Sequence, residues 1–122
     1  MVWKFDEKSP IYVQIAQHIK MQIISSNIQE GEQLPTVRKL AEEYGVNPNT
    51  MQRAFSELER EGLVYSQRTS GRFVTNNTHF IMEKRREVAM AELQSFVSNM
   101  QKMGFQTSDI VAVLESYIKE KH

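Results

Sequence analysis

The stretch LPTVRKLAEEYGVNPNTMQRAFSELEREGL, residues 34–63, decides the fold because it holds two short amphipathic patterns separated by a tight turn. Thr36 is a suitable N-cap for the first pattern, since its hydroxyl can accept a hydrogen bond from the backbone of the next turn. The apolar positions of this pattern share one helix face: Val37, Leu40, Ala41 and Tyr44. Gly45 follows them and can adopt the left-handed conformation that ends a helix. The first pattern therefore predicts a short helix between Thr36 and Gly45.

A second helix is predicted to begin almost at once. Asn47 is an N-cap candidate, Pro48 suits the first helical position, and Gly62 marks the end. Its apolar face consists of Met51, Ala54, Phe55 and Leu58. At about 100° per residue, the opposite face carries Asn49, Gln52, Arg53 and Ser56. Two short helices joined by a tight turn, the second carrying side chains that can bond to base edges, are the layout of a helix-turn-helix.

The residues before this stretch predict an arm, a helix and a loop. Trp3 and Phe5 occupy alternate positions, which indicates a short extended arm. Isoleucine recurs every four residues between Ile11 and Ile23, which predicts a helix that lasts until Ser25. Ser9 is predicted to cap this helix, with Pro10 at its first position. Residues 29–35 contain glycine and proline and are interpreted as a loop.

The residues after it predict a β-hairpin. Residues 63–67 and 72–75 are typical of two short strands. They flank a turn at residues 68–71, in which Gly71 is expected to need a positive φ. A hairpin in this position is the wing of a winged helix-turn-helix.

Residues 76–122 predict two further helices. The first spans about residues 80–103 and ends at Gly104, and Thr107 is predicted to cap the second. Such a helical hairpin cannot bury both of its faces alone, so we expect it to pair with a second copy in a C2 homodimer. The side chains expected at the dimer interface are Phe96, Met100, Ile110, Leu114, Tyr117 and Ile118.

The predicted fold class is therefore mainly α with a small β-hairpin wing (α+β). Residues 1–75 are expected to form a winged helix-turn-helix DNA-binding domain with a short N-terminal arm. Residues 76–122 are expected to form a two-helix C-terminal dimerisation segment.

Composition argues against several other classes of protein. The chain has no cysteine, no signal-like N-terminus and no apolar run long enough to span a bilayer, so we expect a cytoplasmic protein that does not enter membranes. The histidines His18, His79 and His122 are scattered, which gives no catalytic triad or metal site, so neither enzyme activity nor a cofactor is expected. The methionines Met51, Met100 and Met103 fall at core-like spacings and are interpreted as packing residues.

Net charge is the weak point of a DNA-binding hypothesis. The chain carries 15 Lys+Arg against 15 Asp+Glu, and residues 1–75 carry nine of each. A strongly basic surface is therefore missing, and DNA binding must depend on where the cations are placed.

Four motif blocks carry a family resemblance: LPTVRKLA at residues 34–41, VNPNT at 46–50, LEREGL at 58–63 and GRFV at 71–74. In this order and spacing they resemble the GntR family of bacterial regulators, over roughly residues 10–75. The short remainder of the chain resembles the YtrA-like subfamily. This resemblance implies a homodimer that binds double-stranded DNA at a palindromic operator and often represses genes for membrane transporters.

The helix pattern and the resemblance together predict DNA contacts from Thr36, Arg38, Asn49, Thr50, Gln52, Arg53, Gly71 and Arg72. In the leading hypothesis, Asn49, Gln52 and Arg53 read the major groove, while Thr36 and Arg38 bind phosphates. The resemblance implies the DNA contact of Arg38, which matches the arginine of the family's LPSxR block. The resemblance implies that Gly71 and Arg72 approach the minor groove from the wing. Three departures from the family are Thr36 in place of serine, Pro48 in place of arginine, and Thr69-Ser70 in place of Gly-Lys, and the last two remove positive charge.

Alternatives stay open for single residues and for the whole chain. Arg38 could pair with Glu42, and Arg53 with Glu57, at helical i, i+4 spacing, each pair contributing only about 0.3 to 0.5 kcal/mol. The neutral charge also suits a protein-interaction module on a winged-helix scaffold. A ligand-gated sensor would need an effector pocket, and no pattern in the sequence identifies a small-molecule effector.

Overall fold

The computed structural model describes residues 4–121, which form two compact units, one through Lys84 and the other from Arg85. The division lies inside the helix α4 (Thr78–Lys102) and not at residues 75/76, where the domain boundary was expected. The reason is that the first turn of α4 belongs to the first core: Ile81 is 5% exposed there and Phe80 packs beside it. Among the described residues, no helix combines the length and the apolar character needed to cross a bilayer.

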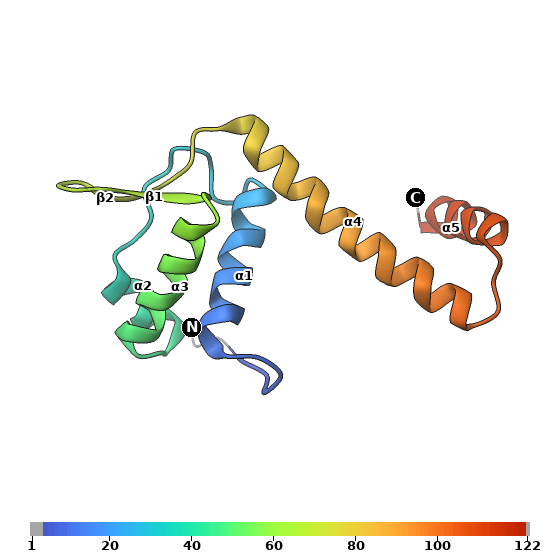
Figure 1. Cartoon of the computed structure of the whole chain (residues 1–122), viewed down its shortest axis with the longest axis horizontal. Helices are drawn as coiled ribbons and strands as arrows, with labels where there is room; N and C mark the ends of the chain where they lie inside the picture. The colour runs from blue at the N-terminus through green and yellow to red at the C-terminus, as the bar shows by residue number, and fades with distance from the viewer. Residues whose placement is uncertain (1–3, 122) are drawn as a thin grey trace. The chain divides into compact units, whose positions relative to one another are not determined.

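The first unit contains the predicted helix-turn-helix (Figure 1). Helix α1 (Ile11–Ile24) precedes α2 (Val37–Tyr44) and α3 (Pro48–Arg60). The Thr36 hydroxyl accepts a hydrogen bond from the Lys39 amide at 3.1 Å, and Gly45 has φ 72°, so the predicted start and stop of α2 are confirmed.

The starts of α1 and α3 differ in how they are capped. The Asn47 side chain accepts from the Asn49 amide at 2.8 Å with Pro48 in the first turn, as predicted. The predicted cap at Ser9 is wrong, because Pro10 occupies the N-cap position without a side-chain hydrogen bond and α1 begins at Ile11. In the N-terminal arm Phe5 packs against the core, and Trp3 lies outside the described residues.

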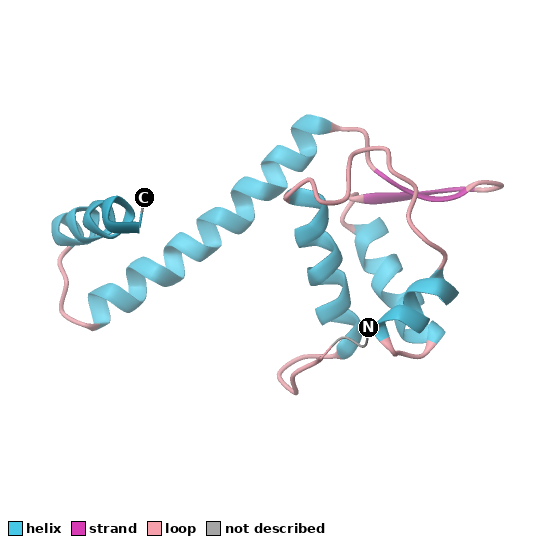
Figure 2. Ribbon diagram, turned by 180° about the vertical axis from the view of Figure 1, so that it is seen from behind, coloured by secondary structure: helices cyan, strands magenta, loops and turns pink. Residues whose placement is uncertain are grey.

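The wing is an antiparallel hairpin of β1 (Val64–Gln67) and β2 (Gly71–Val74), drawn in magenta in Figure 2. Residues 29–35 were expected to be a loop, but part of this segment lies along the free edge of β2. Gln33 forms a bridge with Phe73, the Leu34 amide donates to the Arg72 carbonyl at 2.9 Å, and the Gly31 amide donates to the Val74 carbonyl at 3.0 Å. This pairing covers one edge of the hairpin and ties it to the segment that leads into α2.

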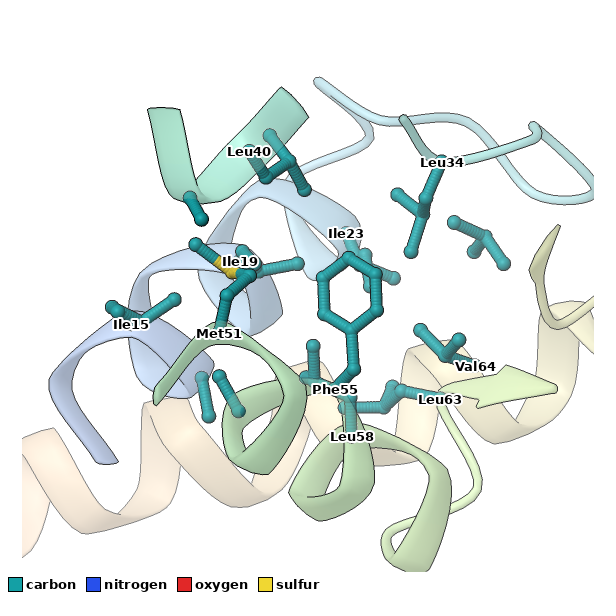
Figure 3. Packing of buried hydrophobic residues seen from close by; sticks show 14 of the residues in the cluster. Ile15, Ile19, Ile23, Leu34, Leu40, Met51, Phe55, Leu58, Leu63 and Val64 are labelled. Carbon is teal, nitrogen blue, oxygen red and sulfur yellow. The ribbon is translucent and has the colours of Figure 1, made fainter. Parts of the chain in front are cut away.

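The core of the first unit joins the three helices to the hairpin (Figure 3). Its fully buried members come from α1, from α3, from the residue just before β1, and from β2: Ile15, Ile23, Met51, Phe55, Leu58, Leu63 and Val74. Figure 3 shows the ring of Phe55 in the middle of the labelled side chains. These contacts set the direction of α3, because its whole apolar face is enclosed and only its polar face remains open.

The second unit is a helical hairpin made of the remainder of α4 and of α5 (Thr107–Lys121). Gly104 has φ 98° in the turn between the helices. Thr107 is the first residue of α5 and not its cap, so that prediction is wrong by one position. The interpretation of Met103 as a core residue is also wrong: its side chain is 65% exposed, one residue beyond the end of α4.

Candidate nucleic-acid interface

The polar face of α3 is the surface best suited to reading bases. Asn49, Gln52, Arg53 and Ser56 are all exposed, on the side opposite the buried Met51, Ala54, Phe55 and Leu58. Amide and guanidinium groups bond in pairs to adenine and guanine edges in the major groove, and α3 presents both types. The structure thus brings three of the predicted base-reading residues onto one open face. Thr50 is half-buried at the flank of this face.

The N-terminal turn of α2 supplies a second group of polar atoms. Thr36 is exposed, and its hydroxyl oxygen already accepts the Lys39 amide, so its proton remains available to a phosphate oxygen. Arg38 is exposed, and within residues 4–121 it forms no salt bridge, so the alternative pair with Glu42 is not formed. Lys39 is also exposed, next to Arg38. Sequence reasoning missed Lys39, although its position beside a predicted phosphate contact was a usable signal.

Arg53 is held by an aromatic ring. Its Cζ atom lies 4.0 Å from the centroid of the Tyr12 ring, which α1 places beside α3. The alternative pair between Arg53 and Glu57 does not form as a salt bridge. Instead, Glu57 accepts from the Arg60 Nη2 atom at 2.7 Å, and this hydrogen bond is the main cause that lowers the pKa of Glu57. The charge of Arg53 lowers the same pKa further.

Arg72 is held in a different way, by a carboxylate. Its Nε atom donates to Glu59 Oε1 at 2.5 Å, and its Cζ atom lies 5.0 Å from the centroid of the Phe55 ring. Ser66 donates to the same Glu59 oxygen at 2.9 Å. Burial alone would raise the pKa of Glu59, but the hydrogen bonds from Arg72 and Ser66 outweigh it and lower this pKa. Arg72 therefore ties β2 to α3, and the structure does not present its guanidinium freely beside the other predicted DNA contacts.

The tip of the wing combines a glycine of positive φ with an exposed cation. Gly71 has φ 109°, a conformation that L-residues with side chains rarely adopt, so its predicted positive φ is confirmed. The Gln33 amide donates to the Ser70 carbonyl at 2.5 Å and so braces the turn from the neighbouring segment. Arg68 is exposed in this turn. Sequence reasoning did not select Arg68, because the family resemblance directed attention to Gly71 and Arg72.

The six residues expected at a dimer interface divide into three groups in the second unit. Met100 and Ile110 are only 8% and 5% exposed, because each is covered within its own chain. Phe96 and Leu114 are half-buried. Tyr117 and Ile118 are 58% and 49% exposed and remain available to a partner. Met100 and Ile110 therefore stabilise the hairpin within one chain, whatever Tyr117 and Ile118 contact.

Comparison with known proteins places the chain among DNA-binding regulators. The sequence profile of the bacterial regulatory proteins of the gntR family matches residues 11–74. The uncharacterized HTH-type transcriptional regulator YhcF of Bacillus subtilis is 32% identical, over 93% of this chain and 94% of its own length. The HTH-type transcriptional repressor YtrA of the same organism is 31% identical, over 92% of this chain and 84% of its own.

Solved structures give the same result. A GntR family transcriptional regulator from Listeria monocytogenes superposes with a TM-score of 0.84 at 34% identity, covering 92% of this chain and 98% of its own. The DNA-binding domain of AraR in complex with the operator ORX1 has a TM-score of 0.55 and 29% identity, over 62% of this chain and 95% of its own. The second similarity is to a DNA-binding domain that was solved together with its operator.

Proposed function

The chain belongs to the GntR family of bacterial regulatory proteins, DNA-binding transcriptional regulators without enzymatic activity, and on this premise we propose that it is a homodimeric repressor of an inverted-repeat operator. The observation that carries this proposal is the open polar face of α3, where Asn49, Gln52 and Arg53 are exposed while the opposite face is buried. The names of two relatives, the repressors YtrA and NagR, support repression as the direction of control.

In the proposed complex, α3 of each subunit enters the major groove of one half-site. Asn49, Gln52 and Arg53 read base edges, with Thr50 at the flank of the helix. Thr36, Arg38 and Lys39 bind phosphates. At the wing, the backbone of Gly71 approaches the minor groove and the side chain of Arg68 binds a phosphate at its edge, while Arg72 stays with Glu59 and positions the hairpin.

Exposed apolar side chains of the second unit support the homodimer. They are Met90, Leu93, Met103, Phe105, Val111, Val113, Tyr117 and Ile118, each between 37% and 65% exposed. A helical hairpin with this much uncovered apolar surface is stabilised by pairing with a copy of itself. Dimerisation then brings two α3 helices to half-sites about one helical turn, or a multiple of it, apart, so the operator should be an inverted repeat.

The regulated genes are proposed to be a transporter-type operon, on the basis of the YtrA-like resemblance. Footprinting on the DNA upstream of the protein's own gene, with random-sequence competitor present, tests the operator. Protection of an inverted repeat is the expected result. Weak binding without any protected site, removed equally by random DNA, would contradict the proposal and favour the protein-interaction module.

Arg53→Ala tests base reading on the protected site. Removing one bidentate contact per half-site should cost about 1 to 3 kcal/mol for each subunit on the operator and much less on random DNA. Arg60→Ala is the matched control, because Arg60 is an exposed arginine of the same helix whose guanidinium is paired with Glu57. Equal losses on operator and random DNA for Arg53→Ala would refute its role in base reading.

Salt dependence tests the phosphate contacts. If Arg38, Lys39 and Arg68 of both subunits each neutralise a phosphate, the logarithm of the affinity should fall with log salt at a slope of about −5. Arg68→Ala should reduce this slope by about two and weaken operator and random DNA alike. An affinity that does not change with salt would argue against all of these contacts.

The oligomeric state can be tested by sedimentation. Ile118→Asp places a charge on the exposed face of α5 and should shift the protein to monomers. Met21→Asp is the control, because Met21 is 44% exposed on α1 in the first unit and should leave the dimer intact. A wild-type protein that sediments as a monomer at micromolar concentration would contradict the proposed homodimer.

A further inference from the structure

Tyr12 contacts the recognition helix α3, but the proposed DNA contacts do not include it. It is the second residue of α1 and half-buried, with its ring packed against the edge of the core. The Cζ atom of Arg53 lies over this ring, 4.0 Å from its centroid, although Arg53 itself is exposed. A half-buried residue of the first helix thus supports an exposed cation of the third.

The type of contact decides whether the N–H donors of Arg53 can still bond to a base. An arginine that stacks on an aromatic ring lies face to face with it, whereas its N–H donors lie in the guanidinium plane and point away from the contact; the 4.0 Å distance fits this arrangement. Stacking therefore leaves those donors available to a base. A carboxylate partner occupies the donors instead, as Glu59 does with the Nε atom of Arg72.

Holding Arg53 in place also changes the entropy of binding. A free arginine side chain samples many rotamers and loses this freedom when it bonds to a base. A stacked arginine has lost part of that freedom before DNA arrives, so less is lost on binding. The ring, moreover, belongs to a helix and packs against the core, and does not come from a neighbouring loop.

The geometry points to Tyr12 as a positioning residue for base recognition: its ring holds the guanidinium of Arg53 in the orientation in which the N–H donors face the major groove. This inference rests on the proposed function, in which Arg53 reads a base. Tyr12 itself contacts no DNA in this arrangement and acts through Arg53.

Two substitutions of Tyr12 separate the ring from the rest of the side chain. Tyr12→Phe keeps the ring and should bind the operator like the wild type. Tyr12→Leu keeps apolar packing but removes the ring, and should weaken operator binding about two- to fivefold per half-site, or about 4- to 25-fold for a dimer. Thermal melts check folding, and Tyr12→Met, with its adaptable unbranched side chain, replaces Tyr12→Leu if that variant unfolds.

A double-mutant cycle with Arg53→Ala distinguishes positioning from a merely structural role. If Tyr12 acts through Arg53, Tyr12→Leu should have no further effect on operator affinity in the Arg53→Ala background. An equal loss in both backgrounds would overturn the inference. Wild-type affinity of the folded Tyr12→Leu protein would overturn it as well.

A measurement on the free protein, without DNA, distinguishes failure of this inference from failure of the proposed function. In NMR spectra of the free protein, the Nε–Hε signal of Arg53 should show an upfield ring-current shift in the wild type and in Tyr12→Phe, which Tyr12→Leu abolishes. Absence of the shift in the wild type would overturn the inference even if the operator is bound. If the shift is present but the wild type prefers no DNA site, the proposed function fails and the recognition role of Tyr12 fails with it.

Discussion

Glu59→Gln is the sharpest test of how the wing is attached, because Glu59 connects α3 to both strands of the hairpin. Its carboxylate accepts from Arg72 of β2 and from Ser66 of β1. The side chain of Glu59 is 33% exposed and that of Arg72 is 24% exposed. Hydrogen bonds to charged groups contribute about 1.5 to 3 kcal/mol when buried, and exposed ion pairs about 0 to 1. This partly exposed site lies between these limits. Glutamine retains one acceptor oxygen, so we expect a loss near the lower value, about 1 kcal/mol.

Thermal and urea unfolding measure this loss. For a domain the size of the winged unit, about 1 kcal/mol corresponds to a fall in Tm of about 4 to 8 °C. Glu57→Gln is the matched control, since Glu57 lies on the same helix and pairs with an arginine that is 71% exposed, and its substitution should leave Tm unchanged. Because folding lowers the pKa of Glu59, its contribution is present above the ordinary carboxyl pKa and disappears as the pH falls below about 4. The stabilities of wild type and Glu59→Gln should therefore converge in acid.

DNA binding by the same variant decides the role of Arg72. If Arg72 positions the wing, Glu59→Gln should weaken operator binding, because the hairpin is less firmly attached. If Arg72 is itself a minor-groove contact restrained by Glu59, releasing it should strengthen binding. Equal stability of Glu59→Gln and Glu57→Gln, or tighter operator binding by Glu59→Gln, would refute the argument.

Three further predictions concern the wing, the first helices and the cap of α2. Gly71→Ala should lower operator affinity and cost about 1 to 3 kcal/mol in urea unfolding, because φ is 109° there and the added Cβ would lie 3.0 Å from Gln33 Nε2. Burial lowers the pKa of His18, whose Nδ1 atom lies 2.8 Å from the Tyr44 hydroxyl, so the unfolded chain binds the proton first as the pH falls below about 6.5. Urea midpoints measured between about pH 7.5 and 5.5 should therefore fall more in the wild type than in His18→Gln, and identical profiles would contradict this. Thr36→Ala should cost about 1 kcal/mol through the lost cap, and an unchanged Tm would show that the hydrogen bond to Lys39 contributes nothing.

The parts of the fold that sequence predicted are those set by local interactions. The turn between α2 and α3 depends on Gly45 and on the caps at Thr36 and Asn47, all of which act within a few residues. The amphipathic face of α3 is likewise visible as a period in the sequence. The cap at Ser9 was misassigned because serine followed by proline is the usual pattern of an N-cap and a first helical residue, whereas here α1 begins one residue later, at Ile11.

The parts that sequence missed depend on contacts between distant segments. The pairing of Gln33 with Phe73 spans 40 residues, and residues 29–35 carry glycine and proline that are typical of loops. The contact between Tyr12 and Arg53 requires the packing of α1 on α3, and neither residue has a sequence signal for the other. For the same reason the role of Arg72 was assigned from its place at the wing tip, while its partner Glu59 lay 13 residues away on another element.

The neutral charge of residues 1–75 is compatible with DNA binding once the pairs are located. The acidic residues of α3 and of its C-cap, Glu57, Glu59 and Glu61, pair with Arg60, Arg72 and Lys20. These acids would repel phosphates if they were unpaired, but each is neutralised within its own domain. The exposed cations Arg38, Lys39 and Arg68 form no salt bridges within residues 4–121, and Arg53 is stacked rather than ion-paired. A net charge near zero therefore combines two groups of residues with different roles. The acids of α3 and its C-cap stabilise the fold through ion pairs, and the cations without acidic partners remain available to DNA.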